Sequence, residues 1–190
     1  MKILDIGCGN RKFPGAIGVD KVKLPGVDVI YDLNQYPYPF KDNQFDLIIM
    51  NHIIEHISDV VRFLEEIYRV AAPNAIIKGL TPHFSSPYSF ADPTHHHHFT
   101  FSTFYFFSKK SPRVSKLRRR LNNLLGCDSI PRQYYSKVNF EVIKIKILFR
   151  KFLRMLGVST FANSFPEIYE FYLSGIFRAR DIYFELKVIK

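Results

Sequence analysis

The sequence predicts an α/β fold whose doubly wound sheet is mostly parallel, and three observations support this prediction. Short runs of apolar and β-branched residues end at Gly, Pro or Asp, which is typical of buried strands. An amphipathic helix pattern lies between two of these runs. The first run leads directly into a turn that contains Gly7 and Gly9. Ligands of open α/β sheets bind beyond the carboxyl ends of the strands, where such turns lie.

Four strands are expected in the first half of the chain, followed by a helix and a fifth strand. The four strands occupy residues 2–6, 17–19, 28–31 and 45–50. Ser58 or Asp59 is expected to cap the helix, whose apolar positions are Val60, Phe63, Leu64, Ile67 and Ala71. Pro73 should end the helix, and a Pro73-Asn74 turn should lead into the fifth strand, residues 75–80. Asn tolerates the left-handed conformation that such a turn needs.

After residue 80 the chain departs from this alternation. Residues 81–108 are rich in histidine and aromatic residues, and Ser102 is a candidate N-cap for a short aromatic helix. Residues 109–131 are basic and turn-rich, as in a mobile insertion. The remaining expected elements are a strand at 139–149, a helix that begins at Pro166 and a last strand at 182–189. We expect one domain, residues 1–190, in which residues 81–131 form the substrate region or a lid.

The turn after the first strand predicts a nucleoside cofactor. Glycine there allows a tight turn and a close approach of the ligand, and Asp20 is placed to hold ribose hydroxyls. A dinucleotide motif needs a third glycine where this chain has Lys12, and Asp20 follows Gly9 too soon for a full crossover helix. The Asp5 carboxylate would repel a pyrophosphate but suits an ammonium and a sulfonium group. The pattern therefore favours S-adenosylmethionine over NAD and FAD.

The chain resembles the Rossmann-like class I S-adenosylmethionine-dependent methyltransferases, and within them the type 11 methyltransferase domain family. The resemblance is carried by Leu4-Asp5-Ile6-Gly7-Cys8-Gly9, Gly18-Val19-Asp20, residues 42–49 and Glu55-His56. It implies transfer of a methyl group from S-adenosylmethionine to an unidentified acceptor, and a last strand that is antiparallel. The cofactor-binding residues it implies are Asp5, Gly7 and Gly9 for the methionine part, Asp20 for the ribose, Asp32 for the adenine, and Asn51 and His52 beside the methionine.

Two departures from the family bear on the site. Arg11 stands where the family often has a small residue. Its guanidinium either pairs with the carboxylate of the cofactor or remains solvated. The usual helix before the first strand is lacking, so we expect the histidine-rich and basic segments to help cover the site.

Histidines are the candidates for a general base, because imidazole titrates near neutral pH. His83 directly follows the fifth strand and is the first candidate, with His95 second and His52 third. An amine acceptor would need no base.

Two histidine patterns also suggest metal ligands. The His52-Ile53-Ile54-Glu55-His56 segment matches an inverted zinc-protease pattern, but it precedes the expected helix, so the two imidazoles need not share a face. Neighbouring histidines at 95–98 should project in different directions. We therefore expect no metal, and a zinc hydrolase remains only a third alternative.

The charge of the chain is concentrated in one segment. Residues 109–154 hold 14 Lys and Arg against two acidic residues, while the whole chain has a net charge of +10. This segment suits an anionic partner such as RNA, a phospholipid or a phosphate-bearing glycan. The main alternative to an enzyme is thus a non-catalytic nucleoside-pocket protein that binds RNA or an anionic membrane. Two cysteines and the lack of a long apolar run favour a cytoplasmic protein, with peripheral membrane contact left open.

Overall fold

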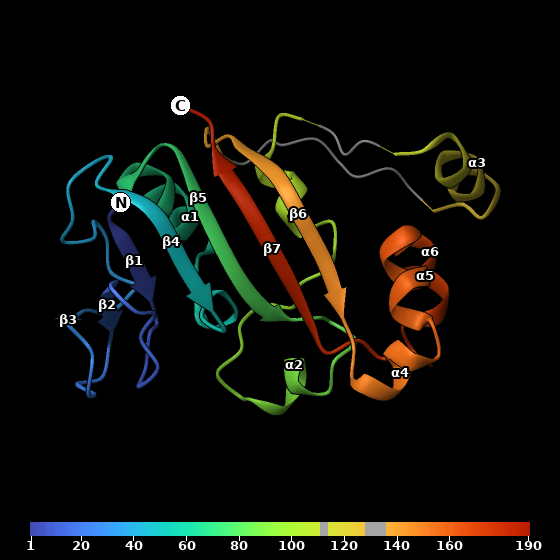
Figure 1. Ribbon diagram of the computed structural model, residues 1–190, viewed down its shortest axis with the longest axis horizontal. Helices are drawn as coiled ribbons and strands as arrows, with labels where there is room; N and C mark the ends of the chain where they lie inside the picture. The colour runs from blue at the N-terminus through green and yellow to red at the C-terminus, as the bar shows by residue number, and fades with distance from the viewer. Residues whose placement is uncertain (111–113, 128–135) are drawn as a thin grey trace.

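The computed structural model describes residues 1–110, 114–127 and 136–190, and a single sheet runs through them (Figure 1). The strand order is β3-β2-β1-β4-β5-β7-β6. The strands are β1 (Ile3–Ile6), β2 (Ile17–Asp20), β3 (Val29–Ile30), β4 (Phe45–Asn51), β5 (Ala71–Pro82), β6 (Phe140–Leu148) and β7 (Asp181–Val188). β7 is antiparallel to β5 and to β6, and the pairs from β3 to β5 are parallel. The predicted mostly parallel sheet with an antiparallel last strand is confirmed.

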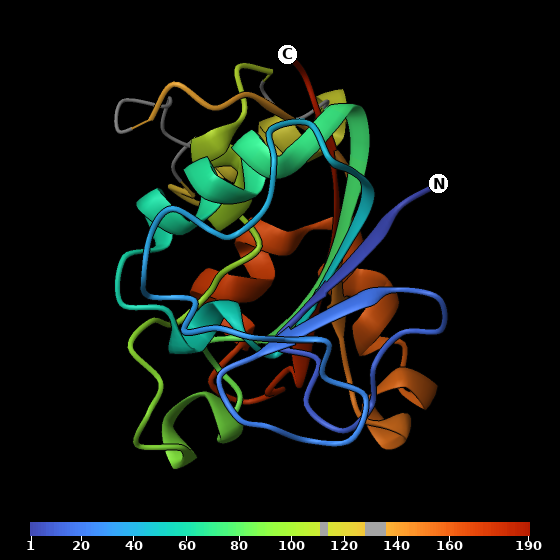
Figure 2. The ribbon, with the colours of Figure 1, turned by 90° about the vertical axis from the view of Figure 1, so that its left-hand side faces the viewer.

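Helical segments lie on both sides of this sheet, with α1 on one side and α4 and α5 on the other (Figure 2). The α-helices are α1 (Val60–Val70), α2 (Tyr88–Ala91), α3 (Lys116–Leu124), α4 (Lys151–Met155), α5 (Val158–Ser164) and α6 (Pro166–Ile168). The shorter helical turns are η1 (Ile54–His56), η2 (Thr103–Phe107) and the π-helical η3 (Tyr169–Leu173). Among the described residues, none of these helices has the length and apolar character needed to cross a bilayer.

Helix α1 begins as predicted and ends earlier. The Asp59 side chain accepts a hydrogen bond from the backbone N–H of Arg62, which identifies Asp59 as the N-cap. The helix stops at Val70, because Ala71 already pairs with Phe45 of β4. Asn74 has the expected left-handed conformation, with a φ of 65°. The Pro73-Asn74 segment is therefore an irregularity within β5, and the prediction that the helix extends to Pro73 is wrong.

The second half contains more helix than the sequence pattern predicted. α3 lies in the segment expected to be turn-rich, and α4 and α5 were not expected. Ser102 occupies the N-cap position of η2, but its side chain makes no capping hydrogen bond. Pro166 does open a helix, which continues as the π-helical turn η3. Part of the expected insertion, residues 111–113 and 128–131, lies outside the described residues.

Strand β6 is the edge strand of the sheet, and Asn163 of α5 attaches to its backbone. The Asn163 side chain accepts a hydrogen bond from Ile147 N at 2.9 Å and donates to Ile147 O at 2.9 Å. Its amide also donates to Ser159 O at 2.8 Å, within α5. Ala162 beside it is fully buried in a cluster that includes Ile147. These contacts fix α5 against the outer strand.

A largely buried ion pair helps to hold helix α3 against α6. Arg118 donates to both carboxylate oxygens of Glu167, at 2.8 Å from Nε and 2.5 Å from Nη2. Burial alone would raise the pKa of Glu167, but the two bonds from Arg118 hold that pKa below its usual range. The Arg118 guanidinium also lies 5.5 Å from the centre of the Phe101 ring. Arg118, a cation of the basic segment, therefore forms an internal contact and is not available to an anionic partner.

Replacing Arg118 with Ala should destabilise the docking of α3, because the Glu167 carboxylate would remain largely buried without its partner. We expect a loss of about 2–3 kcal/mol in the free energy of unfolding, together with faster amide hydrogen exchange across α3. Arg119→Ala is the matched control, since Arg119 is exposed on the same helix. An equal effect of the two substitutions in urea unfolding would contradict the role of the ion pair.

Candidate active site

The turn after β1 has the conformation that its glycines predict. Gly7 has a φ of 66°, and a Cβ there would lie 2.7 Å from Cγ1 of Ile53, in the loop after β4. Gly9 has a φ of 52°, and a Cβ there would meet nothing within 4 Å. Gly7 is therefore required for contact between two loops, whereas Gly9 leaves open space beside the backbone. A ligand can approach the main chain closely at Gly9.

Two of the predicted carboxylates organise this turn. Asp5 is only 5% exposed and accepts a hydrogen bond from the backbone N–H of Phe13 at 2.6 Å. Burial raises the pKa of Asp5 above its ordinary value. Asp20 at the end of β2 accepts from Gly9 N at 2.9 Å and from Val22 N at 3.0 Å. Asp20 therefore joins the turn after β1 to the end of β2.

The other predicted cofactor residues lie on the same edge of the sheet. Asp32 follows β3 and is exposed, with its carboxylate accepting from Asn34 N at 3.0 Å. Asn51 ends β4, and His52 follows with a left-handed φ of 53°. Arg11 is exposed on the turn after β1. Carboxylates and an open glycine turn at one edge fit a ligand with an adenosyl group and a positively charged methionine part.

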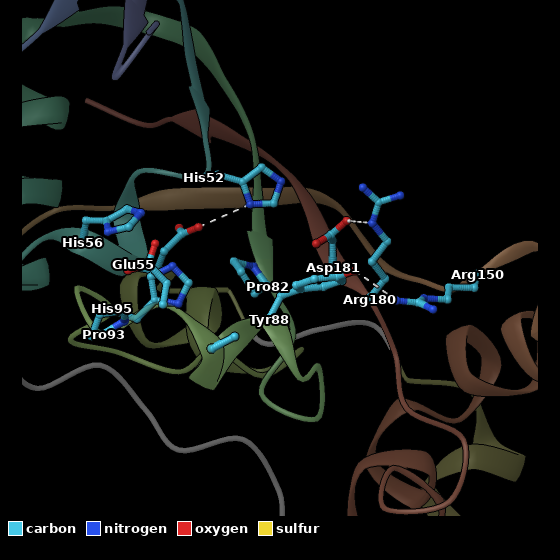
Figure 3. Close-up of a pocket in the computed structure, with 12 residues that line it drawn as sticks. His52, Glu55, His56, Pro82, Tyr88, Pro93, His95, Arg150, Arg180 and Asp181 are labelled. Atoms are coloured by element: carbon cyan, nitrogen blue, oxygen red, sulfur yellow. Dashed lines mark hydrogen bonds and ion pairs between the residues drawn. The ribbon is translucent and has the colours of Figure 1, made fainter. Parts of the chain in front are cut away.

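A cavity of about 900 Å³ opens beside the ends of β4 and β5 (Figure 3). His52, Glu55 and His56 line it from the loop after β4, and Asp92 and His95 line it from the histidine-rich segment. Arg150, Arg180 and Asp181 line it from the ends of β6 and β7. In Figure 3 the imidazoles and Glu55 gather on one side of the cavity, and the two guanidinium groups lie on the other.

Glu55 is the buried acid of this cavity. It is 1% exposed, and its carboxylate accepts a hydrogen bond from the Thr81 hydroxyl at 3.1 Å. The Nδ1 atom of His52 lies 3.3 Å from the other carboxylate oxygen. This hydrogen bond raises the pKa of His52. On the opposite side, burial raises the pKa of Asp181, which pairs with Arg180 at 3.1 Å.

His83, the first candidate for a base, is placed differently from the other two. It is fully buried and is not among the residues that line the cavity. Its Nδ1 accepts from Ser85 N at 3.1 Å, and its Nε2 lies 3.1 Å from Glu170. Both ring nitrogens are thus engaged within the protein. The structure brings together His52 and His95, the third and second candidates, and separates His83 from them.

Sequence reasoning did not identify Glu55, Arg150, Arg180 or Asp181 as part of one cavity. In the sequence, Glu55 belonged to the family motif and to the inverted zinc-protease pattern, but its burial was not predictable, since it depends on contact with Thr81 of β5. Arg150 follows β6, and Arg180 precedes β7. These two strands are paired in the sheet. No local sequence pattern predicts that Arg150 and Arg180 lie close together, because their closeness depends on the strand order.

Comparison with known proteins is in agreement with this architecture. The methyltransferase domain family matches residues 14–77. A SAM-dependent methyltransferase from Archaeoglobus fulgidus superposes with a TM-score of 0.55 at 18% identity, covering 98% of this chain and 85% of that one. An S-adenosylmethionine-dependent methyltransferase from Mesorhizobium loti has a TM-score of 0.54 at 15% identity, covering 98% and 90%.

Curated relatives match shorter stretches. The bifunctional methionine biosynthesis protein MetXA/MetW of Rhodopirellula baltica is 31% identical over 113 residues, which is 43% of this chain and 18% of the relative. The 2-phytyl-1,4-naphtoquinone methyltransferase of a Nostoc species is 43% identical over 44 residues, or 23% of this chain and 19% of the relative. The matched part thus spans about a fifth of the length of each relative.

The fold is that of the class I, Rossmann-like methyltransferases, as the resemblance seen in the sequence predicted. Within that class, the chain matches the methyltransferase domain family. Both solved structures are S-adenosylmethionine-dependent methyltransferases, and the family match covers about a third of this chain.

Asp5→Asn should have opposite effects on two quantities: it should raise the stability of the fold and lower the affinity for the cofactor. Asn retains an oxygen acceptor for Phe13 N–H and removes a charge that burial disfavours. The pKa of Asp5 is raised in the fold, so the folded carboxylate carries a penalty that is present at neutral pH and disappears below about pH 4. We therefore expect Asp5→Asn to raise Tm at pH 7 but not at acid pH.

The same variant should bind S-adenosylmethionine about tenfold more weakly or worse, because a charged partner of the cofactor is lost. Thermal unfolding at both pH values and calorimetry measure the two effects. Asp46→Asn is the control, since Asp46 is an exposed acid of β4. A Tm of Asp5→Asn below that of the unchanged protein at pH 7 would contradict the assignment.

Proposed function

We propose that this protein transfers a methyl group from S-adenosylmethionine to an acceptor that binds in the cavity between His52 and Arg180. The observation that carries the proposal is the position of this cavity, whose His52 directly follows the strand that ends beside the glycine turn. The bound cofactor supplies a methyl group already activated by the sulfonium. The protein then has to hold the acceptor in line and exclude water.

The residues proposed to hold the cofactor are Asp5, Gly7, Gly9, Asp20, Asp32 and Asn51, with Arg11 available for its carboxylate. Their support is the shared edge of β1 to β4 and the open space beside Gly9. Asp5 offers a carboxylate to the positive charge of the methionine part. Asp20 offers one to ribose hydroxyls, and two backbone N–H groups already fix its orientation.

For a hydroxyl acceptor, we propose His52 as the group that accepts the proton. The Glu55 carboxylate holds Nδ1 of His52, which leaves Nε2 with a lone pair beside the cavity. His83 has both ring nitrogens occupied and lies outside the cavity lining. This geometry favours His52 over His83 as the base.

The acceptor is proposed to carry an anionic group. Arg150 and Arg180 both line the far side of the cavity, and Asp181 is the acid beside them. Arg150 donates to the Tyr88 hydroxyl at 3.1 Å, which orients its guanidinium. A planar guanidinium suits a phosphate or a carboxylate. Two such groups favour a phosphate- or carboxylate-bearing small molecule as the methyl acceptor.

Calorimetry with S-adenosylmethionine, S-adenosylhomocysteine and NADH tests the cofactor assignment. We expect binding of both adenosyl ligands and none of NADH. Asp20→Ala should abolish measurable binding, because the ribose acid and two loop contacts are lost. Asp46→Ala should bind normally. At about 100 times its dissociation constant, the cofactor should add about 2.7 kcal/mol to the free energy of unfolding.

If neither S-adenosylmethionine nor S-adenosylhomocysteine binds, the methyltransferase proposal is overturned. Binding without transfer of labelled methyl to any anionic alcohol or amine would favour the non-catalytic alternative.

We further propose that the basic segment meets an anionic lipid surface. Phe152 and Met155 of α4 are 68% and 76% exposed and stand beside Lys151 and Arg154. Apolar side chains among cations are typical of a surface that rests at a lipid interface. The RNA alternative needs aromatic side chains for stacking. Phe140 is fully buried and cannot stack on a base, whereas the exposed Phe152 suits either partner, so the preference for a lipid surface rests on the exposed Met155 beside it.

Vesicles that contain phosphatidylserine should retain the protein at low salt and release it as salt rises. Replacing Phe152 and Met155 together with Ser should weaken retention about tenfold, since two exposed apolar groups no longer enter the interface. Ile30→Ser is the matched control, because Ile30 is 55% exposed on the distant edge strand β3. Retention on RNA but not on vesicles would exclude the lipid surface.

A further inference from the structure

We propose that Glu55, His56 and His95 form a binding site for one divalent transition-metal ion at the wall of the acceptor cavity. The three residues each offer a ligand atom, and these atoms all lie within 4.8 Å of one another. All three line the same cavity (Figure 3). The sequence suggested no metal, because neither histidine pattern supplies a convergent set by itself. The fold joins two residues of one pattern to one residue of the other.

The backbone holds the two segments together at this point. Glu55 and His56 belong to η1, directly after β4. The backbone N–H of His96 donates to Glu55 O at 2.8 Å, which fixes the histidine-rich segment against η1. The rings of His56 and His95 lie 4.6 Å apart at an angle of 70°.

Hydrogen bonds select the free nitrogen of each imidazole. The Thr94 hydroxyl donates to Asp92 at 2.6 Å, so its oxygen accepts from Nδ1 of His56 at 2.9 Å. The Ser89 carbonyl lies 3.1 Å from Nδ1 of His95 and can only accept. In the neutral form of each ring, the proton therefore lies on Nδ1 and the lone pair on Nε2. Metal-binding histidines are usually oriented in this way, by a carbonyl or a carboxylate behind the ring.

The third ligand is a buried carboxylate whose neighbours are one hydroxyl and one imidazole. Glu55 is 1% exposed and has the neutral Thr81 hydroxyl on one oxygen. Its other oxygen faces His52, which is also the proposed base. A buried carboxylate beside two neutral imidazoles with free lone pairs is a place where a cation is stabilised.

The ligand set indicates the kind of ion. Two imidazoles and one carboxylate suit Zn²⁺, Co²⁺ or Mn²⁺, whereas Mg²⁺ prefers oxygen ligands throughout. With three protein ligands, further coordination positions remain open toward the cavity. This is the arrangement of a metal that binds a substrate oxygen.

If the proposed function holds, the open position receives the hydroxyl of the acceptor and lowers its pKa. The hydroxyl proton passes to Nε2 of His52, and the oxygen forms a bond to the methyl carbon of the cofactor. The carbon–sulfur bond breaks, and its electron pair remains on sulfur in S-adenosylhomocysteine. The site thus points to a hydroxyl-bearing anion as the acceptor, and to O-methylation.

Zinc binding to the purified full chain, measured by equilibrium dialysis, tests the site directly. We expect one Zn²⁺ per chain, and a Co²⁺ form with the visible absorption of a low-coordinate nitrogen and oxygen site. His56→Ala and His95→Ala should each weaken Zn²⁺ binding by about 100-fold. Glu55→Gln should weaken it as well while retaining acceptor and donor groups for Thr81 and His52. His96→Ala is the matched control, because His96 is an exposed neighbour in the same run.

If His96→Ala weakens Zn²⁺ binding and His56→Ala does not, the metal binds adventitiously to the histidine run. That result would overturn the proposal. Circular dichroism of each variant confirms folding. Cofactor binding measured on the same samples separates the two proposals. Absent Zn²⁺ binding with intact S-adenosylmethionine binding overturns only the metal site, and the reverse result overturns only the proposed function.

Discussion

A carboxylate that is removed from water must be surrounded by donors or cations, and Glu55 imposes this requirement on the centre of the molecule. Its side chain contacts His52 at the end of β4 and Thr81 near the end of β5. Its backbone carbonyl holds the histidine-rich segment through His96. Three segments that are distant in sequence thus converge on one residue.

The cofactor half of the fold was largely predictable because its signals are local. A glycine that needs a positive φ, an acid that ends a strand and Asp59 as an N-cap each act within a few residues. The end of α1 was missed since Ala71 fits an apolar helix position equally well. Its pairing with Phe45, which decides the matter, is a tertiary contact.

The cavity beside the ends of β4 and β5 was less predictable, because the residues that line it meet only through the strand order. Arg150 and Arg180 come together because β7 inserts between β5 and β6. His83 looked accessible after the fifth strand, but packing against Glu170 of η3 buries it. The net charge of the basic segment was evident from the sequence, but the pairing of its individual cations was not. Arg118 is paired with Glu167, and Lys110 forms an ion pair with Glu141 at 2.8 Å.

The short loops between β1 and β4 also have an effect on the site. Without helices in those crossovers, the turns lie directly on one another, as Gly7 does on Ile53. A change in one turn is therefore transmitted to the next by contact. Asp20, which accepts a hydrogen bond from Gly9 of the same turn, and His52, which precedes Ile53, are both in contact with this layer.

The amide of Asn163 has a consequence beyond stability. An outer strand presents unpaired N–H and C=O groups, to which a strand of another chain can add. By bonding to both backbone groups of Ile147, Asn163 imitates the neighbour that β6 lacks. At Ile147 this edge of the sheet is covered by a side chain, which disfavours edge-to-edge association between molecules along β6 without a further strand.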